Sequence, residues 1–141
     1  MDKVRQLIRL SIVNETGASA ITNVVADRVY PSQVAAQPNP VYPCLCFQIQ
    51  AGVGEAVTNV WQGTMRTWCW SDQNEVGTYD DAVALHQALE TYWHRQSFND
   101  ATLLRAVALS ILGVPTQFFD PDVRAYAAVA DWNLFASELT S

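Results

Sequence analysis

The side chains suited to catalysis or metal binding are few in this sequence, and they are poorly spaced for either task. His86 and His94 are the only histidines, and they stand eight residues apart in a predicted helix. Eight residues are a little over two turns, so the rings share a face but lie about 12 Å apart along the axis. They cannot bind one metal ion directly, and His86 lacks the HExxH pattern. We expect both histidines at the surface or at the boundary of the core.

The three cysteines, Cys44, Cys46 and Cys69, are the other candidate metal ligands. They could meet across adjacent strands with a histidine as fourth ligand, but the CxC spacing is too short for a zinc knuckle. An odd count is also a poor basis for a disulfide framework. We therefore expect three reduced thiols in a reducing compartment and no metal site.

The remaining polar residues suggest no reaction. Asp80 and Asp81 stand where a helix begins, and acidic residues there stabilise the helix dipole. Asp120 and Asp122 flank a proline in a turn, and "GVGEA" lacks the glycine and lysine pattern of a phosphate-binding loop. No Ser/His/Asp constellation can be assembled. The sequence predicts no catalytic residues, no cofactor and a protein that is not an enzyme.

Composition fits one globular domain spanning residues 1–141. Half of the residues are hydrophobic and only 16% are charged, which is enough apolar material for a core. The net charge of −6 argues against a surface that binds a nucleic-acid backbone broadly. No apolar run reaches the 18 residues of a membrane span, and the N-terminal segment lacks the continuous apolar core of a secretory signal.

Periodicity divides the first half of the chain. An apolar stripe predicts a helix over residues 4–12, and a short second helix is expected over 18–24. The prolines that follow allow only a brief edge strand at 28–30 and an irregular connection. Residues 41–50 alternate and predict a strand with at least one buried face. The segment 51–63, rich in glycine and valine and almost uncharged, predicts a long hairpin loop.

In the second half, alternation predicts a strand over residues 61–70, and a helical stripe follows at 82–93. Residues 101–114 fit either a buried strand or a helix rich in Ala and Leu. The neighbouring elements favour a strand, which Gly113 and Pro115 should end. An Asp-Pro-Asp turn then separates two extended runs, of which 123–135 is a long strand.

The predicted order is helix, strand, strand, strand, helix, strand, strand. Two hairpins imply mainly antiparallel pairing. The sequence therefore predicts an α+β fold, in which an N-terminal helix and a central helix pack on one face of a mainly antiparallel sheet with a long hairpin loop. It shows no internal repeat and no second domain.

These patterns also assign side chains to the core or to contacts. The aromatic residues exceed what one small core easily encloses, and exposed uncharged aromatics suit protein–protein contact. A thick core between sheet and helices, with the loop valines folded back onto it, is the alternative. The predicted core residues are Leu7, Ile8, Leu45, Phe47, Trp68, Leu85 and Leu89. The predicted contacts with other subunits or partners are Val53, Gly54, Val57, Val60, Trp61 and Trp132.

The layout resembles the tail-terminator, or tail-completion, proteins of long-tailed bacteriophages. The matching pieces are the helix "VRQLIRLSI", "DRVYP", "YPCLCFQI", the strand "MRTWCWS" and the helix "YDDAVALHQALETYW". They span most of the chain and describe a fold pattern without a catalytic fingerprint. The tryptophan content and the CxC strand depart from the pattern. The matching positions are Arg28, Val29, Tyr30, Pro31, Pro43, Trp70, Ser71, Ala82, Leu85, Ala88 and Leu89.

The resemblance implies a structural virion protein at the head–tail junction, present in the host cytoplasm during assembly and not at a membrane. Six copies would form a ring on the last ring of the tail tube protein, stop tube growth and dock the head connector. DNA would pass through the lumen without specific binding, which an acidic chain favours. The alternatives are a neck or head-completion protein of the same junction and, from another class, a small enzyme or metal-binding module.

Overall fold

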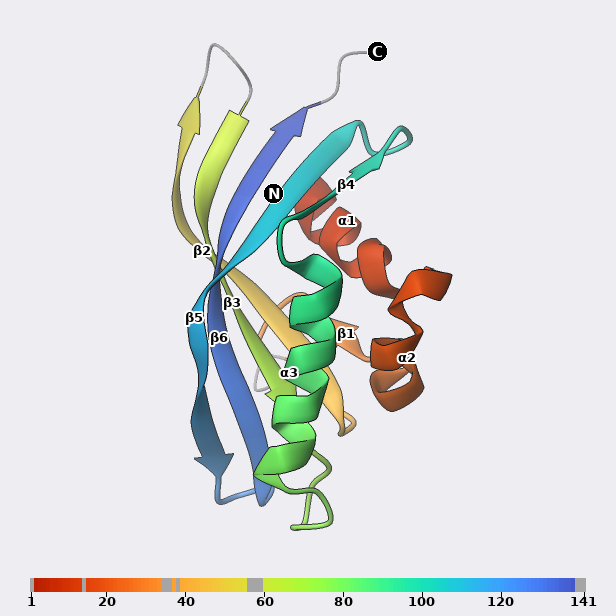
Figure 1. Ribbon diagram of the computed structural model, residues 1–141, viewed down its shortest axis with the longest axis vertical. Coiled ribbons are helices and arrows are strands. Elements are labelled where there is room, and N and C mark those ends of the chain that lie inside the picture. Colours follow the sequence, from red (N-terminus) through yellow and green to blue (C-terminus); the bar gives the residue numbers. More distant parts are fainter. Residues whose placement is uncertain (1, 14, 34–36, 38, 56–59, 139–141) are drawn as a thin grey trace.

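The computed structural model describes residues 2–13, 15–33, 37, 39–55 and 60–138, and it confirms the α+β class. Three α-helices lie on one side of a twisted sheet (Figure 1). The helices are α1 (Asp2–Val13), α2 (Ser19–Val25) and α3 (Tyr79–Trp93), with a 3-10 turn at Thr16–Ala18. The strands are β1 (Val29–Tyr30), β2 (Cys44–Glu55), β3 (Val60–Trp70), β4 (Gln96–Asp100), β5 (Arg105–Asp120) and β6 (Ala125–Glu138).

The described strands form one sheet in the order β1-β2-β3-β6-β5-β4. The two-residue β1 runs parallel to β2, and every other pairing is antiparallel. We call the face covered by the helices the inner face and the opposite one the outer face. Side chains alternate between these faces along each strand.

The main core fills the space between the helices and the inner face. Helix α1 contributes a stripe spaced by three and four residues that includes Leu7 and Ile8. Helix α3 begins with a capping box, in which the Thr78 hydroxyl accepts from the Asp81 amide and the Asp81 carboxylate accepts from the Thr78 amide. Six of the seven predicted core residues are buried here: Leu7, Ile8, Leu45, Phe47, Leu85 and Leu89.

The prediction for Trp68 is wrong. Its side chain lies on the outer face and is only partly buried, against a second and smaller cluster. The alternation of β3 had separated Trp68 from Met65 and Cys69, and those two residues are the ones that enter the main core. The strand pattern was correct, but Trp68 was assigned to the wrong face.

The predicted end of a strand at Gly113 and Pro115 is also wrong. Strand β5 runs through both residues, because a bulge places two extra residues in β5 between Leu112, which pairs with Asp131, and Thr116, which pairs with Val129. Gly113 takes a φ of 81°, a value that glycine adopts without strain. A bulge at a sheet edge can accommodate a proline that would interrupt a central strand.

Two further boundaries differ from the prediction. Strand β4 was not predicted, since four of its five residues are polar and Phe98 alone packs against the core. The segment predicted as a long hairpin loop is mostly paired strand, because Gly52 pairs with Gly63 and Glu55 with Val60.

Candidate interaction surfaces

His86 is buried, so its predicted place at the surface or at the boundary of the core is wrong. Only 1% of the residue is exposed, and neither ring nitrogen has a hydrogen-bond partner within the described part of the chain. Burial lowers the pKa of His86, while the Glu90 carboxylate 3.6 Å from Nε2 acts in the opposite direction. The helical spacing contained the signal: position 86 follows Ala82 by four residues and precedes Leu89 by three, so it lies in the buried stripe.

His94 has a structural partner. It follows the last residue of α3, and its Nδ1 accepts a hydrogen bond from the backbone amide of Ile111 at 3.0 Å. This bond ties the end of α3 to β5, whereas the ring of His86 faces Trp132 inside the core, with ring centroids 6.3 Å apart. The two histidines therefore occupy different environments and form no joint site.

The cysteines are divided between the two faces of the sheet. Cys69 belongs to the main core, whereas Cys44 and Cys46 lie in the outer cluster. All three are buried free thiols. Burial raises the pKa of Cys69, and a hydrogen bond with Cys44 together with burial raises the pKa of Cys46. Among the described residues, no three metal-binding side chains come together.

The structure changes the picture of the predicted contact residues. Trp132 is fully buried on the inner face, where its ring meets Trp93 edge-on and its Nε1 donates to the Thr67 hydroxyl at 3.0 Å. Its predicted role in a contact is therefore wrong. The prediction used the abundance of aromatics and did not apply the alternation of β6, which groups position 132 with the inner-facing Leu134 and Ala136.

The other predicted contact residues lie along the hairpin of β2 and β3. Val60 and Trp61 are partly buried, and Trp61 packs against the main core. Val53 and Gly54 lie in β2 and pair through their backbones with Gln62 and Trp61. Val57 lies outside the described residues.

The outer face has a small aromatic cluster that sequence reasoning missed. Trp70 makes edge-on contacts with Tyr42 at 5.7 Å and with Phe118 at 5.8 Å between ring centroids. The pKa of Tyr42 is raised to about 12, mainly because the side chain is buried and to a smaller extent because Cys44 is nearby. These rings come from β3, β5 and the segment before β2, so only the folded sheet brings them together. The buried members of the cluster are Tyr42, Cys44, Cys46, Trp70, Ala125 and Ala127.

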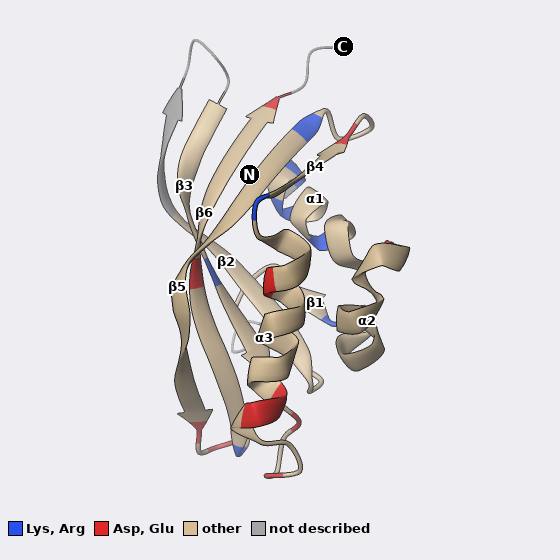
Figure 2. Ribbon diagram, in the orientation of Figure 1, with Lys and Arg blue, Asp and Glu red and all other residues tan. Residues whose placement is uncertain are grey.

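Around this cluster the outer face is exposed and nearly uncharged. Leu112 is 43% exposed, Phe118 48% and Phe135 42%. Arg66 of β3 also lies on this face, where it pairs with Asp131 of β6. The Nε of Arg66 lies 2.8 Å from the Asp131 carboxylate. Most other charges lie on the helices, in the turns and at the strand ends (Figure 2). Such a surface suits contact with protein more than contact with nucleic acid.

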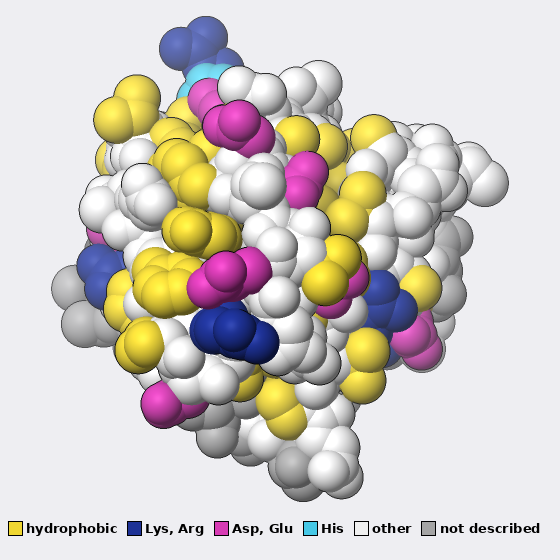
Figure 3. Space-filling model, turned by 90° about the horizontal axis from the view of Figure 1, so that it is seen from below, with side chains coloured by type: hydrophobic (Ala, Val, Ile, Leu, Met, Phe, Trp, Pro, Cys, Tyr) yellow, Lys and Arg dark blue, Asp and Glu magenta, His cyan; other side chains and the backbone are white. Residues whose placement is uncertain are grey.

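The end of the molecule with the β5–β6 turn and the start of α3 is mixed in character. Viewed from below, hydrophobic side chains gather on one side of this end, with acidic side chains between them and few basic ones (Figure 3). The acidic residues at the start of α3 are Asp80 and Asp81. This end therefore combines apolar and negative surface.

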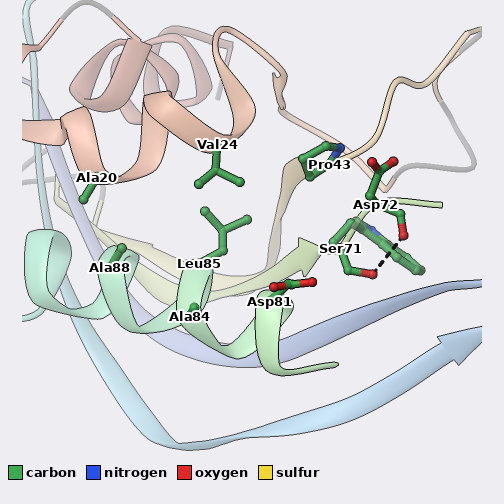
Figure 4. Close-up of a pocket in the computed structure, with 10 residues that line it drawn as sticks. Ala20, Val24, Pro43, Ser71, Asp72, Asp81, Ala84, Leu85 and Ala88 are labelled. Carbon is green, nitrogen blue, oxygen red and sulfur yellow. Dashed lines mark hydrogen bonds between the residues drawn. The ribbon is translucent and has the colours of Figure 1, made fainter. Parts of the chain in front are cut away.

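A pocket of about 450 Å³ lies between α2 and α3. Val24 of α2 and Leu85 of α3 point toward each other across it, and Asp72 and Asp81 lie at one end (Figure 4). Trp70 also lines the pocket, and its indole Nε1 is buried without a partner in the described structure. The lining is mostly apolar and contains no nucleophile paired with a base, so the pocket could shelter an apolar group but offers no evident reaction.

Several positions that matched one sequence pattern are neighbours in space. Arg28 Nε donates to the Pro43 carbonyl at 2.8 Å, and the Leu45 amide donates to the Arg28 carbonyl at 3.0 Å. Tyr30 pairs with Cys46 in the β1–β2 ladder. Ser71 Oγ accepts from the Tyr126 amide at 2.9 Å, directly after Trp70. The short motifs therefore build one corner of the sheet.

No protein-family model matches the chain, and no curated protein matches it significantly. No described helix is both long enough and apolar enough to cross a bilayer.

Proposed function

We propose that this protein is a structural virion component that forms a ring, hexameric by the family pattern, on the end of a phage tail tube. The ring would stop tube growth and join the tail to the head connector, while DNA passes through the lumen. The observation that carries the proposal is the corner at which Arg28, Pro43 and the end of β3 meet. Those residues are among the positions that carry the resemblance to tail-terminator proteins. Their contacts join β1, the start of β2 and the end of β3, which gives the matching motifs one structural role.

The two faces of the sheet support a role in assembly. A subunit of a ring contacts its neighbours head to tail, so it needs two different surfaces. The outer face offers one such surface, because it is not covered by the helices and leaves Leu112, Phe118 and Phe135 exposed. Exposed apolar groups on a charge-poor face are typical of surfaces that become buried on association.

Assembly of the tail tube in vitro tests the proposal. Tube protein from the phage that encodes this chain would be polymerised with and without a molar excess of the purified protein. We expect shorter tubes with a ring of extra density at one tip in negatively stained micrographs. Equal length distributions and bare tips would refute the proposal.

Matched charge substitutions identify the surface used. Phe135 lies on the outer face and is 42% exposed, and Val24 lies in the helix layer and is 43% exposed. We expect Phe135→Asp to abolish tip density and length control, because a charge in a desolvated contact is costly. Val24→Asp should leave both unchanged. The opposite pattern would assign the contact to the helix layer.

A further inference from the structure

Strand β5 leaves most of its outer edge without a strand neighbour among the described residues. Strand β4 pairs only with Arg105–Leu109, although β5 continues to Asp120. On its other side, β5 pairs with β6 along Thr116–Asp120. An open strand edge presents backbone donors and acceptors that can pair with another chain.

The groups that face this open edge follow from the hydrogen bonds that are present. The Leu109 carbonyl accepts from the Arg95 amide, and the Ile111 amide donates to His94. The backbone groups of Leu109 and Ile111 therefore point away from β6. The Tyr126 carbonyl points to β3, since it accepts from the Ser71 amide. The amide and carbonyl of successive residues alternate between the two sides of a strand. Those of Val129, three residues after Tyr126, therefore point to β5, and those of Thr116, with which Val129 pairs, point back to β6. Gln117 and Phe119 therefore direct their amides and carbonyls outward.

Prolines limit this set of free donors on both sides. Pro115 stands two residues before Gln117, and Pro121 stands two residues after Phe119. Neither proline has an amide hydrogen. Between the two prolines, the open edge thus presents two outward donors, at positions 117 and 119, and they are placed symmetrically about Phe118.

Such an arrangement is self-complementary. In an antiparallel pair centred on Phe118, Gln117 lies across from the partner's Phe119 and can exchange two backbone hydrogen bonds with it. The symmetric pair forms two more, so all four outward donors of the two chains are used. Pro115 then lies across from the partner's Pro121, where neither chain has a donor to lose.

Side-chain chemistry favours the same pairing. Residues 106–119 contain no charged side chain, and Asp120 would lie across from the partner's Thr116 rather than from a second carboxylate. Phe118, 48% exposed, would face the partner's Phe118 in a non-hydrogen-bonded pair, the closer of the two pair types. Aromatic pairs across antiparallel strands are stabilising.

We propose that two copies of this chain associate through the Thr116–Asp120 edge as an antiparallel, two-fold symmetric strand pair. This contact is independent of the proposed ring, since ring neighbours meet head to tail and a two-fold contact joins identical surfaces. Prolines on an edge strand can also serve to prevent pairing with another chain. If Pro115 and Pro121 had that role, no dimer would form along this edge.

Light scattering coupled to size exclusion tests the pairing on the full chain. We expect wild-type protein to reach twice its monomer mass of 15.6 kDa as concentration rises. Gln117→Pro removes an outward donor that has no partner in the described part of the chain, and Phe118→Lys places charges face to face. Both variants should return the monomer mass. Phe135 is an aromatic residue of similar exposure on the outer face, and Phe135→Lys should remain dimeric. Circular dichroism establishes that each variant is folded.

A monomer at every concentration would overturn the proposal, as would a dimer that survives both Gln117→Pro and Phe118→Lys. Oxidative cross-linking adds a geometric test. Phe118→Cys places two thiols across the two-fold axis within disulfide range, whereas Asp120→Cys places them about 13 Å apart by strand rise. A covalent dimer from Phe118→Cys alone supports the register, and equal cross-linking of both refutes it. The tube assay decides the proposed function separately, through Phe135→Asp.

Discussion

The inner and outer faces of the sheet are buried to different degrees and by different means. Three helices cover the inner face, and large side chains such as Phe47, Trp93 and Trp132 are fully buried there. The outer face has a smaller cluster around Trp70, and beyond it Phe118 and neighbouring apolar groups remain in contact with solvent. Helix packing thus gives one face its stability, and the other face is left available for contacts.

The tryptophan indoles of the two faces also differ. Indole nitrogens in the main core have partners: Trp132 donates to Thr67, and Trp93 donates to the Ser11 hydroxyl at 3.1 Å. The indole nitrogen of Trp70, in the outer cluster, has no partner among the described residues. The contrast holds for the tryptophans only, because the buried ring nitrogens of His86 on the inner face also have no partner among the described residues.

The largest predicted effect is at Trp132. Trp132→Ala removes a fully buried ring from the main core and leaves the Thr67 hydroxyl without its donor. We expect a loss of about 3–5 kcal/mol in the free energy of unfolding, as for other large-to-small core substitutions. Urea unfolding followed by circular dichroism measures it. A loss below about 1 kcal/mol would mean that Trp132 is not part of a close-packed core.

Trp68→Ala is the matched substitution on the outer face. The ring is partly buried and packs on the smaller cluster, so we expect a loss of about 1–2 kcal/mol, less than for full burial of an aromatic side chain. The ratio of the two losses measures the difference between the faces. Equal losses would indicate that the outer face is packed as tightly as the inner one.

Much of the fold could be predicted because local patterns determine it. Helical stripes gave α1 and α3, and strict alternation gave β2 and β3, since one buried face imposes a period on the sequence. The polar strand β4 has no such period, because it is an edge strand held by pairing to β5. Pro115 was read as a strand end, since only the tertiary pairing with β6 reveals that a bulge accommodates it.

The contact residues were harder to predict for a physical reason. Alternation divides β3 into two sets of side chains but does not say which set faces the helices, so Trp68 was assigned to the wrong face. Trp132 and His86 are residue types that are common at surfaces, and burial overrode that preference. The open edge of β5 follows from the shortness of β4, and no single strand of the sequence displays it.

His86 offers a smaller and pH-dependent test of the inner face. Burial keeps its pKa below the ordinary value of 6.5, so the folded state stays neutral there while the unfolded chain takes up a proton. The unfolded state binds more protons below about pH 6.5, and stability must fall as the pH is lowered. We expect His86→Leu to weaken this fall between pH 7.5 and 5, as measured by urea unfolding at each pH.

At pH 7 His86→Leu should be at least as stable as wild type, because it removes buried nitrogens that lack partners among the described residues, a defect worth about 1–3 kcal/mol. His94→Leu, at the residue that directly follows the same helix, is the control. It deprives the Ile111 amide of its acceptor and should cost about 0.5–1.5 kcal/mol. An unchanged pH dependence in His86→Leu would show that His86 is hydrated in the folded protein.

The smallest predicted effect concerns the ion pair in the middle of the outer face. Arg66 contacts both oxygens of Asp131, with Nε at 2.8 Å and Nη2 at 3.3 Å, and the two side chains are 40% and 41% exposed. Pairs in such contact with water contribute about 0.2–1 kcal/mol, and salt weakens them. A double-mutant cycle with Arg66→Met and Asp131→Asn should therefore give a coupling energy in that range, and the coupling should decrease in 1 M salt.

This cycle also reports on how wet the outer face is under assembly conditions. Removing water strengthens an ion pair because the effective dielectric constant falls, so the coupling depends on what covers the pair. In dilute monomer the coupling should stay within the range of exposed pairs. Repeated at concentrations or on tubes where copies associate, a coupling that rises and loses its dependence on salt would show that a partner has covered this part of the outer face. A coupling that is already large and insensitive to salt in dilute monomer would remove the distinction between the two faces, because both would then be dry.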